Sequence, residues 1–255
     1  YHGAVIDHES SSRSRVFKEC SSIGAELKKL SSLTNHTCPQ AEVAMIYDWE
    51  SRWALNTSSG PKVLEGSGPF SSDLYTETCF DHYEALTRAG ITVDLASIHS
   101  DFKQYRVVIL PALYLVTKEL SERICNFVDT GGRIIATYLT AYVGATNLCH
   151  LGGLPGEGLR ELFGIWNEEV DYLDDMSRVS FTGNISGRAK DIVELIHLKE
   201  AKCIVRAESE FYQGHPLVTT NSYGLGSASY IAARFEISAL LDFYLSVKKE
   251  LCLFS

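Results

Sequence analysis

The chain has 255 residues, of which 45% are hydrophobic and 22% charged, and its formal net charge is −9. This acidic balance argues against a nucleic-acid binder, because phosphate neutralisation needs clustered lysine and arginine. The sequence holds neither an apolar run of about 18 residues nor a basic segment followed by an apolar one, so we expect no membrane partner and no signal peptide.

Seven cysteines are scattered along the chain, and no two of them form a C-x-x-C pair. Several lie inside apolar runs, where a free cysteine acts as a small hydrophobic side chain. This pattern is typical of a reducing compartment rather than of a disulfide framework. It predicts a cytoplasmic protein.

An amphipathic helix is predicted near the start of the chain, over residues 13–30. Its apolar side chains follow a 4-3-4-3 spacing, which aligns them on one face. They are Val16, Cys20, Ile23, Leu27 and Leu30. A stripe of this kind needs a partner surface. The polar segment 31–39, which ends in proline, is predicted to be a linker.

Short apolar segments then alternate with helical ones. Strands are predicted over 42–48, 91–95, 106–110 and 133–138, a loop over 51–71, and helices over 72–89 and 117–130. Ser71 or Ser72 is expected to cap the N-terminus of the first of these helices, and Thr117 that of the second. Each helix is expected to end at a glycine, Gly90 in the first and Gly131 in the second. This alternation is typical of βαβ units, and it predicts a parallel sheet with right-handed crossovers.

The alternation breaks after Thr140. A glycine-rich loop, a short helix over 159–163 and an acidic segment are predicted next. Strand character returns over 201–207, 217–220 and 228–233, with a hairpin turn over 223–226 and a closing helix over 236–249.

The end of the first predicted strand carries the candidate site. A doubly wound sheet binds ligands at the carboxyl ends of its strands, and Asp48, Trp49 and Glu50 follow directly there. Two carboxylates beside an indole fit a polar or sugar-binding rim or an acid/base pair, although strand-end acids more often cap the next element. Trp49 and Trp53, four residues apart, fit either an exposed patch for a partner subunit or core packing.

Cys149 and His150 raise the question of a nucleophile and its base. Hydrolases with this sheet type place the nucleophile on a sharp turn that follows a strand. Here the corresponding strand ends at residues 137–140, which contain no cysteine and no flanking glycine. Adjacent side chains also seldom face each other, so we interpret the pair as loop residues.

Two further patterns are weak as ligand sites. The turn 152–156 lacks the Lys-Ser/Thr of a phosphate-binding loop, so its glycines are interpreted as turn residues. The acidic residues of 168–175 lack the spacing of a calcium loop and fit a solvated face better. The histidines show no metal-binding spacing. We therefore predict no metal and no cofactor.

Several long segments, in order along the chain, resemble glycoside hydrolase family 42 β-galactosidases. They are HGAVIDHE (2–9), SRVFKE (14–19), GAELKKL (24–30), VAMIYDWESRWAL (43–55), HYEALTRAGITVDL (82–95), YRVVILPALYLV (105–116), FVDTGGRIIATYLTAYV (127–143), LGGLPG (151–156) with LRELFGIWNEEVDYL (159–173), FYQGHPLVTTNSYGLGSASYIA (211–232) and the closing helix. The resemblance covers essentially the whole chain.

The resemblance implies a domain organisation. Residues 1–38 would be the C-terminal end of a TIM barrel plus a linker, and residues 39–255 an amidotransferase-like trimerisation domain. That domain would have a three-layer, flavodoxin-like α/β fold with a mostly parallel sheet. In this family the barrel carries both catalytic carboxylates of a retaining mechanism. We expect them before Tyr1, and no catalytic residue in this chain.

The predicted function is a non-catalytic trimerisation and scaffold domain of a β-galactosidase that hydrolyses terminal β-D-galactosides. The parent enzyme is expected to be a homotrimer, and Asp48, Trp49, Glu50 and Trp53 to form a pocket rim or a subunit interface. Two alternatives stay open: a free-standing amidotransferase-like hydrolase that uses Cys149, and a carbohydrate-binding or assembly module.

Overall fold

The computed structural model describes residues 5–6, 8, 11–35, 37, 40–58, 73–174 and 176–253. The chain divides into two compact units, Tyr1–Gln40 and Ala41–Ser255. No helix in the described part of the chain is both long and apolar enough to cross a membrane.

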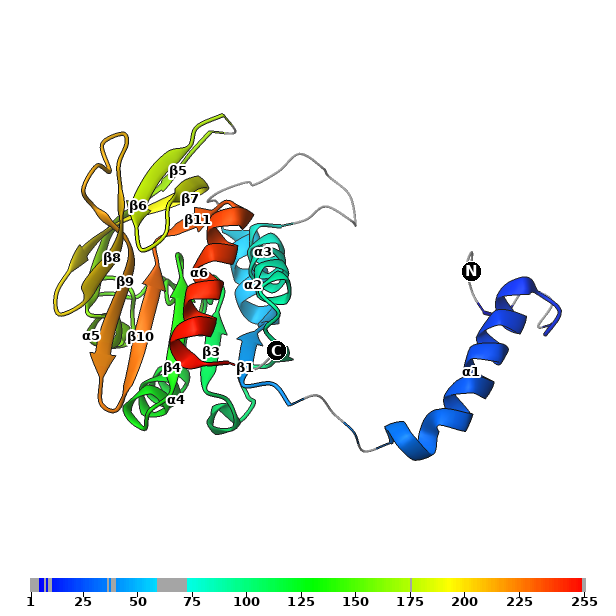
Figure 1. Cartoon of the computed structure of the whole chain (residues 1–255). Helices are drawn as coiled ribbons and strands as arrows, with labels where there is room; N and C mark the ends of the chain where they lie inside the picture. The colour runs from blue at the N-terminus through cyan, green and yellow to red at the C-terminus, as the bar shows by residue number, and fades with distance from the viewer. Residues whose placement is uncertain are drawn as a thin grey trace. The chain divides into compact units, whose positions relative to one another are not determined.

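The first unit contains the helix α1 (Arg15–Thr34), shown in blue in Figure 1. The hydroxyl of Ser14 caps it by accepting a hydrogen bond from the Phe17 N–H at 3.1 Å. None of the residues of α1 is buried, and its apolar stripe continues past Leu30 to the exposed Leu33. The helix therefore extends into the segment that was predicted to be a linker.

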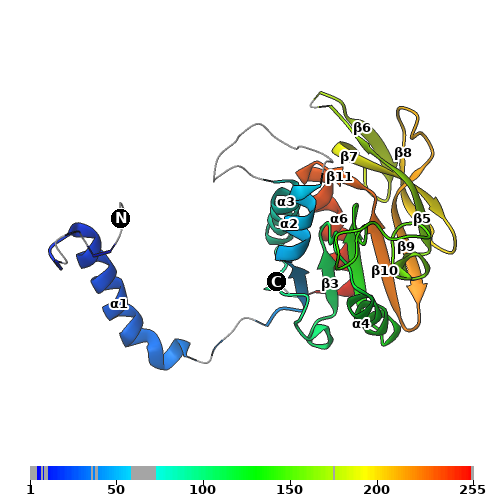
Figure 2. The same cartoon turned by 180° about the vertical axis from the view of Figure 1, so that it is seen from behind.

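The second unit is built around one sheet, which has eleven strands in the part of the chain that the structure describes. Five of them pair in parallel, in the order β2-β1-β3-β4-β10 (Figures 1 and 2). Their bounds are β1 (Val43–Ile46), β2 (Val93–Ala96), β3 (Val107–Leu110), β4 (Arg133–Thr137) and β10 (Gly226–Ile231).

Helices cover both faces of this parallel part, as predicted. Their bounds are α2 (Trp49–Thr57), α3 (Leu74–Arg88), α4 (Lys118–Asp129), α5 (Leu159–Phe163) and α6 (Ile237–Leu251), with a short 3₁₀ helix η1 (Phe102–Gln104). Val43 and Met45 of β1 pack in the same core as α3 and α6, whereas Ala44 and Ile46 pack in the core of α4 and α5. Every residue of β1, β3 and β4 is buried, which explains the continuous apolar sequences of β1 and β3 and the apolar centre of β4.

The remaining strands are antiparallel, so the prediction of a mostly parallel sheet was wrong for this half. They follow β10 in the order β9-β8-β6-β7-β11, and β5 also pairs with β7. Their bounds are β5 (Ile165–Tyr172), β6 (Val179–Gly183), β7 (Gly187–Leu198), β8 (Lys202–Ala207), β9 (Pro216–Tyr223) and β11 (Ala233–Phe235). The chain is therefore a mixed α/β protein.

Several local predictions are confirmed and two are corrected. Thr117 caps α4, α5 has its predicted bounds, and the hairpin turn between β9 and β10 joins Tyr223 and Gly226. The loop predicted over 51–71 is wrong at its start, because α2 extends to Thr57. The cap of α3 is Asp73, whose carboxylate accepts the Thr76 N–H at 2.7 Å. The serines predicted for that role lie outside the described residues.

Candidate functional site

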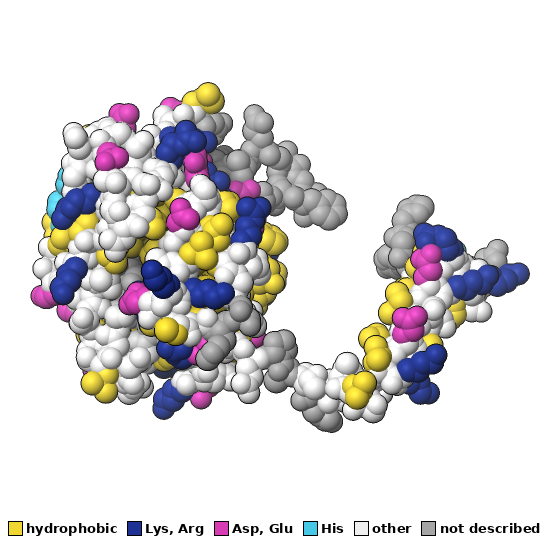
Figure 3. All heavy atoms as spheres, in the orientation of Figure 1, with side chains coloured by type: hydrophobic (Ala, Val, Ile, Leu, Met, Phe, Trp, Pro, Cys, Tyr) yellow, Lys and Arg dark blue, Asp and Glu magenta, His cyan; other side chains and the backbone are white. Residues whose placement is uncertain are grey.

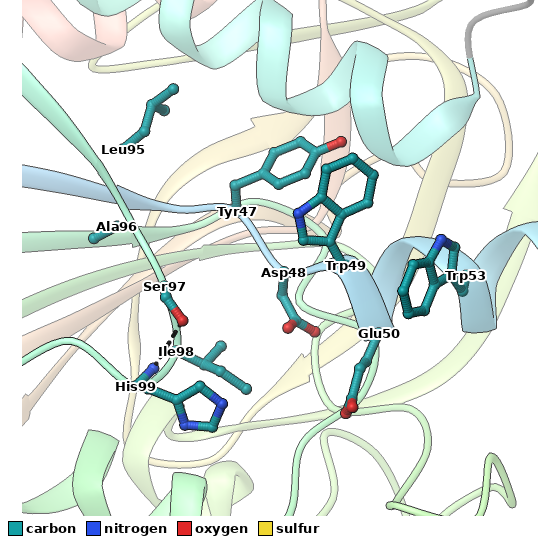
Figure 4. A pocket seen from close by; sticks show the side chains of 10 residues that line it. All are labelled: Tyr47, Asp48, Trp49, Glu50, Trp53, Leu95, Ala96, Ser97, Ile98 and His99. Atoms are coloured by element: carbon teal, nitrogen blue, oxygen red, sulfur yellow. Dashed lines mark hydrogen bonds between the residues drawn. The ribbon is translucent and has the colours of Figure 1, made fainter.

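The carboxyl ends of β1 and β2 form an open hollow of about 520 Å³ at the edge of the sheet. It is lined by Tyr47, Asp48, Trp49, Glu50, Trp53, Leu95, Ala96, Ser97, Ile98 and His99 (Figure 4). Because β2 is the last strand of the sheet, the hollow borders solvent. The structure thus brings the four predicted site residues together.

Asp48 serves as the N-cap of α2. Its buried carboxylate accepts the Ser51 N–H at 2.7 Å, and its own N–H donates to the Tyr75 hydroxyl at 2.7 Å. An aspartate at this position satisfies a free N–H of the first helical turn. Glu50 is exposed in that turn. The carboxylate of Asp48 therefore caps the start of α2. This role does not favour an acid/base pair with Glu50.

The two tryptophans are surface residues. Trp49 is 52% exposed and Trp53 is 60% exposed, so neither is a core residue. The Trp49 ring lies 5.3 Å from that of Tyr47 and 6.1 Å from that of Trp53, between ring centroids. The guanidinium of Arg52 lies 5.2 Å from the Trp49 centroid and forms an ion pair with Asp73. These contacts hold Trp49 in place while its ring faces solvent.

An apolar hollow of about 300 Å³ adjoins this site. It is lined by Met45, Tyr47, Thr76, Cys79, Phe80, Tyr83 and Leu95, and so shares Tyr47 and Leu95 with the first hollow. Phe80 and Tyr83 of α3 and Leu95 of β2 are exposed. Figure 3 shows hydrophobic side chains at the surface around α3. We call Tyr47, Trp49, Trp53, Phe80, Tyr83 and Leu95 together the aromatic surface.

Sequence reasoning missed the contribution of α3 to this surface. Phe80 and Tyr83 lie three residues apart on a helix that also buries Tyr75, Cys79 and Leu86. Apolar residues thus occupy two faces of α3, and periodicity alone does not separate the buried face from the exposed one.

Cys149 and His150 are not arranged as a nucleophile and its base. The thiol of Cys149 is exposed and points to the backbone carbonyl of His150, with Sγ and O 3.7 Å apart. The imidazole packs against Gly156, where an added Cβ would lie 2.3 Å from the ring. Its Nδ1 lies 3.3 Å from the carboxylate of Glu157. The turn after β4 carries Leu139, at φ +62°.

The acidic segment forms separate pairs rather than a cation site. Glu168 pairs with His197 at 2.5 Å, and Asp171 accepts a hydrogen bond from the Tyr212 hydroxyl. Asp175 lies outside the described residues. Among the residues that the structure does describe, no group of three or more His, Cys, Asp or Glu side chains is arranged to hold a metal ion.

A family model described as the β-galactosidase trimerisation domain matches residues 41–253. The chain belongs to this family. The matched range lies within the second compact unit of the structure and contains all the residues of the aromatic surface.

Relatives of this trimerisation domain occur within longer proteins. β-Galactosidase Pbg of Clostridium perfringens is 38% identical over 261 residues, which cover 99% of this chain and 37% of that protein. β-Galactosidase BgaP of Planococcus sp. is 37% identical, with 98% and 37% covered. The chain thus spans little more than a third of the length of the curated relatives it matches.

Solved structures of β-galactosidases also match nearly the whole of this chain over about a third of their own length. The β-galactosidase from Rahnella sp. R3 superposes with a TM-score of 0.85 at 39% identity, covering 99% of this chain and 37% of that one. The β-galactosidase from Bacillus circulans sp. alkalophilus has a TM-score of 0.85 at 33% identity, with the same coverage. The trimerisation domain described here therefore has the fold of the corresponding part of those enzymes.

Proposed function

We propose that this chain is the trimerisation and scaffold part of a β-galactosidase, whose retaining reaction uses two carboxylates on a TIM barrel. Residues 1–38 would be the end of that barrel plus the linker, and residues 39–255 the trimerisation domain. The division of the structure after Gln40 and the family match from residue 41 support this boundary. The six described cysteines are all free, which supports a cytoplasmic location.

We further propose that the parallel half is a flavodoxin-like, amidotransferase-like core. The order β2-β1-β3-β4-β10, numbered by appearance among the parallel strands, is 2-1-3-4-5. This is the strand order of doubly wound flavodoxin-like sheets. The turn after β4 lies where the related hydrolases carry their nucleophile, and here it carries Leu139. The core would thus have the fold of those hydrolases without their catalytic nucleophile.

The chain by itself is expected to be catalytically silent. Asp48 caps α2 and Cys149 faces a backbone carbonyl, so neither is prepared to act on a glycosidic bond. Incubated with a chromogenic β-galactoside, the purified chain should release no chromophore above the blank, while a complete β-galactosidase at equal concentration does. Turnover that persists on repurification and disappears in Glu50→Gln would contradict this proposal.

The observation that carries the proposal of self-association is the exposed aromatic surface within a trimerisation-domain fold. Aromatic side chains are enriched in the buried centres of interfaces. A cyclic trimer uses two different patches per subunit, so the aromatic surface would meet another face of the next copy. Asp48 would support this contact by fixing the start of α2, and Glu50 would lie at its polar rim.

Removing the two indoles is expected to weaken assembly with little effect on folding. Interface tryptophans commonly contribute about 2 kcal/mol or more, so each of Trp49→Ala and Trp53→Ala should raise the dissociation constant about 30-fold. Light scattering over a concentration series measures this. Leu225→Ala removes an exposed leucine from the β9–β10 hairpin and is the matched control. A wild-type chain that stays monomeric at high concentration would contradict self-association through this chain alone.

A further inference from the structure

The loop after β4 presents two leucine side chains to solvent. Leu148 is 71% exposed, and Leu151 is 99% exposed, the highest value among the large hydrophobic side chains that the structure describes. Single exposed leucines are common on protein surfaces, whereas two that lie three residues apart in one loop form a small apolar protrusion. We call Leu148 and Leu151 the leucine pair.

The backbone holds this protrusion in a defined shape. The N–H of Gly144 donates to the Leu148 carbonyl at 3.0 Å, and the N–H of His150 donates to the Tyr142 carbonyl at 3.0 Å. These two bonds close a small hairpin that carries Leu148 and leads directly to Leu151. Side chains on a backbone that is already ordered lose less conformational entropy on binding, which favours a docking role for the leucine pair.

The hairpin is joined to one side of α2. Its Val143 packs with Ala54 of α2 and with Leu115, and the N–H of Leu115 donates to the Ser51 hydroxyl of α2 at 3.0 Å. By the helical repeat, Ser51 and Ala54 lie on the side of α2 that faces away from its two tryptophans. The helix α2 therefore separates the hairpin of the leucine pair from the aromatic surface.

The apolar hollow beside the aromatic surface has the chemistry to receive such side chains. None of the described residues that line it is charged, and its volume of about 300 Å³ is at the low end for small-molecule sites. Met45 and Cys79 of its lining are buried, whereas Phe80 and Leu95 are exposed. A leucine that entered it would leave water and gain dispersion contacts with these side chains.

Resting on the proposed role in trimerisation, we propose that the leucine pair of each copy inserts into the apolar hollow of the next copy. The occupant is a second copy of this chain because the chain belongs to a family of trimerisation domains. The leucine pair is then the other face that the aromatic surface meets. Each subunit supplies one protrusion and one hollow, so three contacts of one kind close the ring.

The positions of the two patches fit a closed ring of three. In such a ring each subunit uses two different patches that face different directions, and the element between them lies nearest the threefold axis. The helix α2 has the hairpin of the leucine pair on one side and its tryptophans on the other. Contact of the aromatic surface with itself would instead give a twofold dimer and leave the leucine pair in water.

The test compares a donor variant and an acceptor variant of the whole chain by light scattering over a concentration series. The donor variant carries Leu148→Asp and Leu151→Asp, and the acceptor variant carries Phe80→Glu. A carboxylate loses its hydration in an apolar contact, so each variant should raise the dissociation constant of the assembly at least about 30-fold. Leu225→Asp, at an exposed leucine of the β9–β10 hairpin, is the matched control and should assemble like wild type.

Folding is checked on the same samples. The replaced side chains are all exposed, so circular dichroism spectra and urea midpoints of the variants should match those of the wild type. If the donor variant does not fold, Leu151→Asp alone, at the more exposed of the two leucines, gives the same test.

Mixing the two variants isolates the proposed contact. The donor variant keeps its hollow and the acceptor variant keeps its leucine pair, so one contact can form between them while the ring cannot close. The mixture should therefore contain a pair of chains, one of each variant, at concentrations where either variant alone is monomeric. A mixture with no species heavier than its components would overturn the proposal.

The outcome for the wild type separates this inference from the proposed function. A donor variant that assembles with the wild-type dissociation constant would overturn the inference while trimerisation stands, and the hollow would then take another occupant, such as a further part of the parent enzyme. A wild type that stays monomeric at high concentration would overturn both.

Discussion

Replacing Arg234 with methionine is expected to lower the free energy of unfolding by about 3–5 kcal/mol, the range for breaking a buried ion pair from one side. Arg234 lies on β11 and is 4% exposed. Its guanidinium contacts Asp81 at 2.8 Å, Asp191 at 2.8 Å and Glu77 at 3.0 Å. One cation thus joins α3 to β7 and β11.

The large effect expected comes from the carboxylates that remain. Methionine matches the length of the arginine stem but leaves three partly buried acids facing a site without its guanidinium. Lys190 is 3.9 Å from Asp81 and compensates only one of them. Glu77 and Asp81 belong to the helix that also carries Phe80 and Tyr83. Loss of Arg234 should therefore loosen part of the aromatic surface as well.

Chemical unfolding at neutral pH, followed by circular dichroism, measures the loss. The matched control is Arg188→Met, which removes a mostly exposed arginine that is 3.3 Å from Glu236. Such surface pairs contribute at most about 1 kcal/mol. If the two substitutions cost the same, the three-carboxylate cluster does not stabilise the fold as described.

The central part of the parallel half was predictable because β1, β3 and β4 are buried on both faces. Continuous apolar runs such as Val107–Leu110 are typical of strands that helices cover on both sides. β5 was not predictable in the same way, because its buried residues Ile165 and Asn167 alternate with exposed ones and the acidic residues follow them. A register shift between Asn167 and Glu169 then breaks that alternation. The acidic strand consequently resembled a loop.

Only those residues of the candidate site that lie close together in the sequence were predictable. Asp48, Trp49, Glu50 and Trp53 follow a strand end, and a general rule for doubly wound sheets selects them. The exposure of Leu95 depends on β2 being the last strand of the sheet, which is a property of the whole topology. The residues that neighbour Leu95 in the sequence do not determine this property.

The surroundings of Glu194, a buried residue of β7, were not predictable from the sequence either. In the sequence it interrupts the apolar run Ile192–Ile196 and resembles an ordinary strand residue. Its carboxyl group accepts hydrogen bonds from the N–H of Leu139, 55 positions away, and from the hydroxyl of Tyr230, 36 positions away. Nothing local in the sequence specifies either contact.

Replacing Gly226 with alanine is expected to lower the free energy of unfolding by about 3 kcal/mol, at the upper end of the usual range for overpacking. Gly226 begins β10 beside the end of α4. A Cβ added there would lie 2.1 Å from the Gly132 carbonyl oxygen and 2.3 Å from the Val128 carbonyl oxygen. Both obstacles are backbone atoms, so rotation of a side chain does not relieve them.

A matched variant separates this contact from the general cost of replacing glycine. Gly214 has φ +85° and no atom within 4 Å of an added Cβ, so Gly214→Ala should cost only about 1 kcal/mol of backbone strain. Urea unfolding of both variants at one pH measures the difference, and equal losses would contradict the contact argument. β10 pairs in parallel with β4 and antiparallel with β9, so moving its first residue strains the joint between the two halves of the sheet.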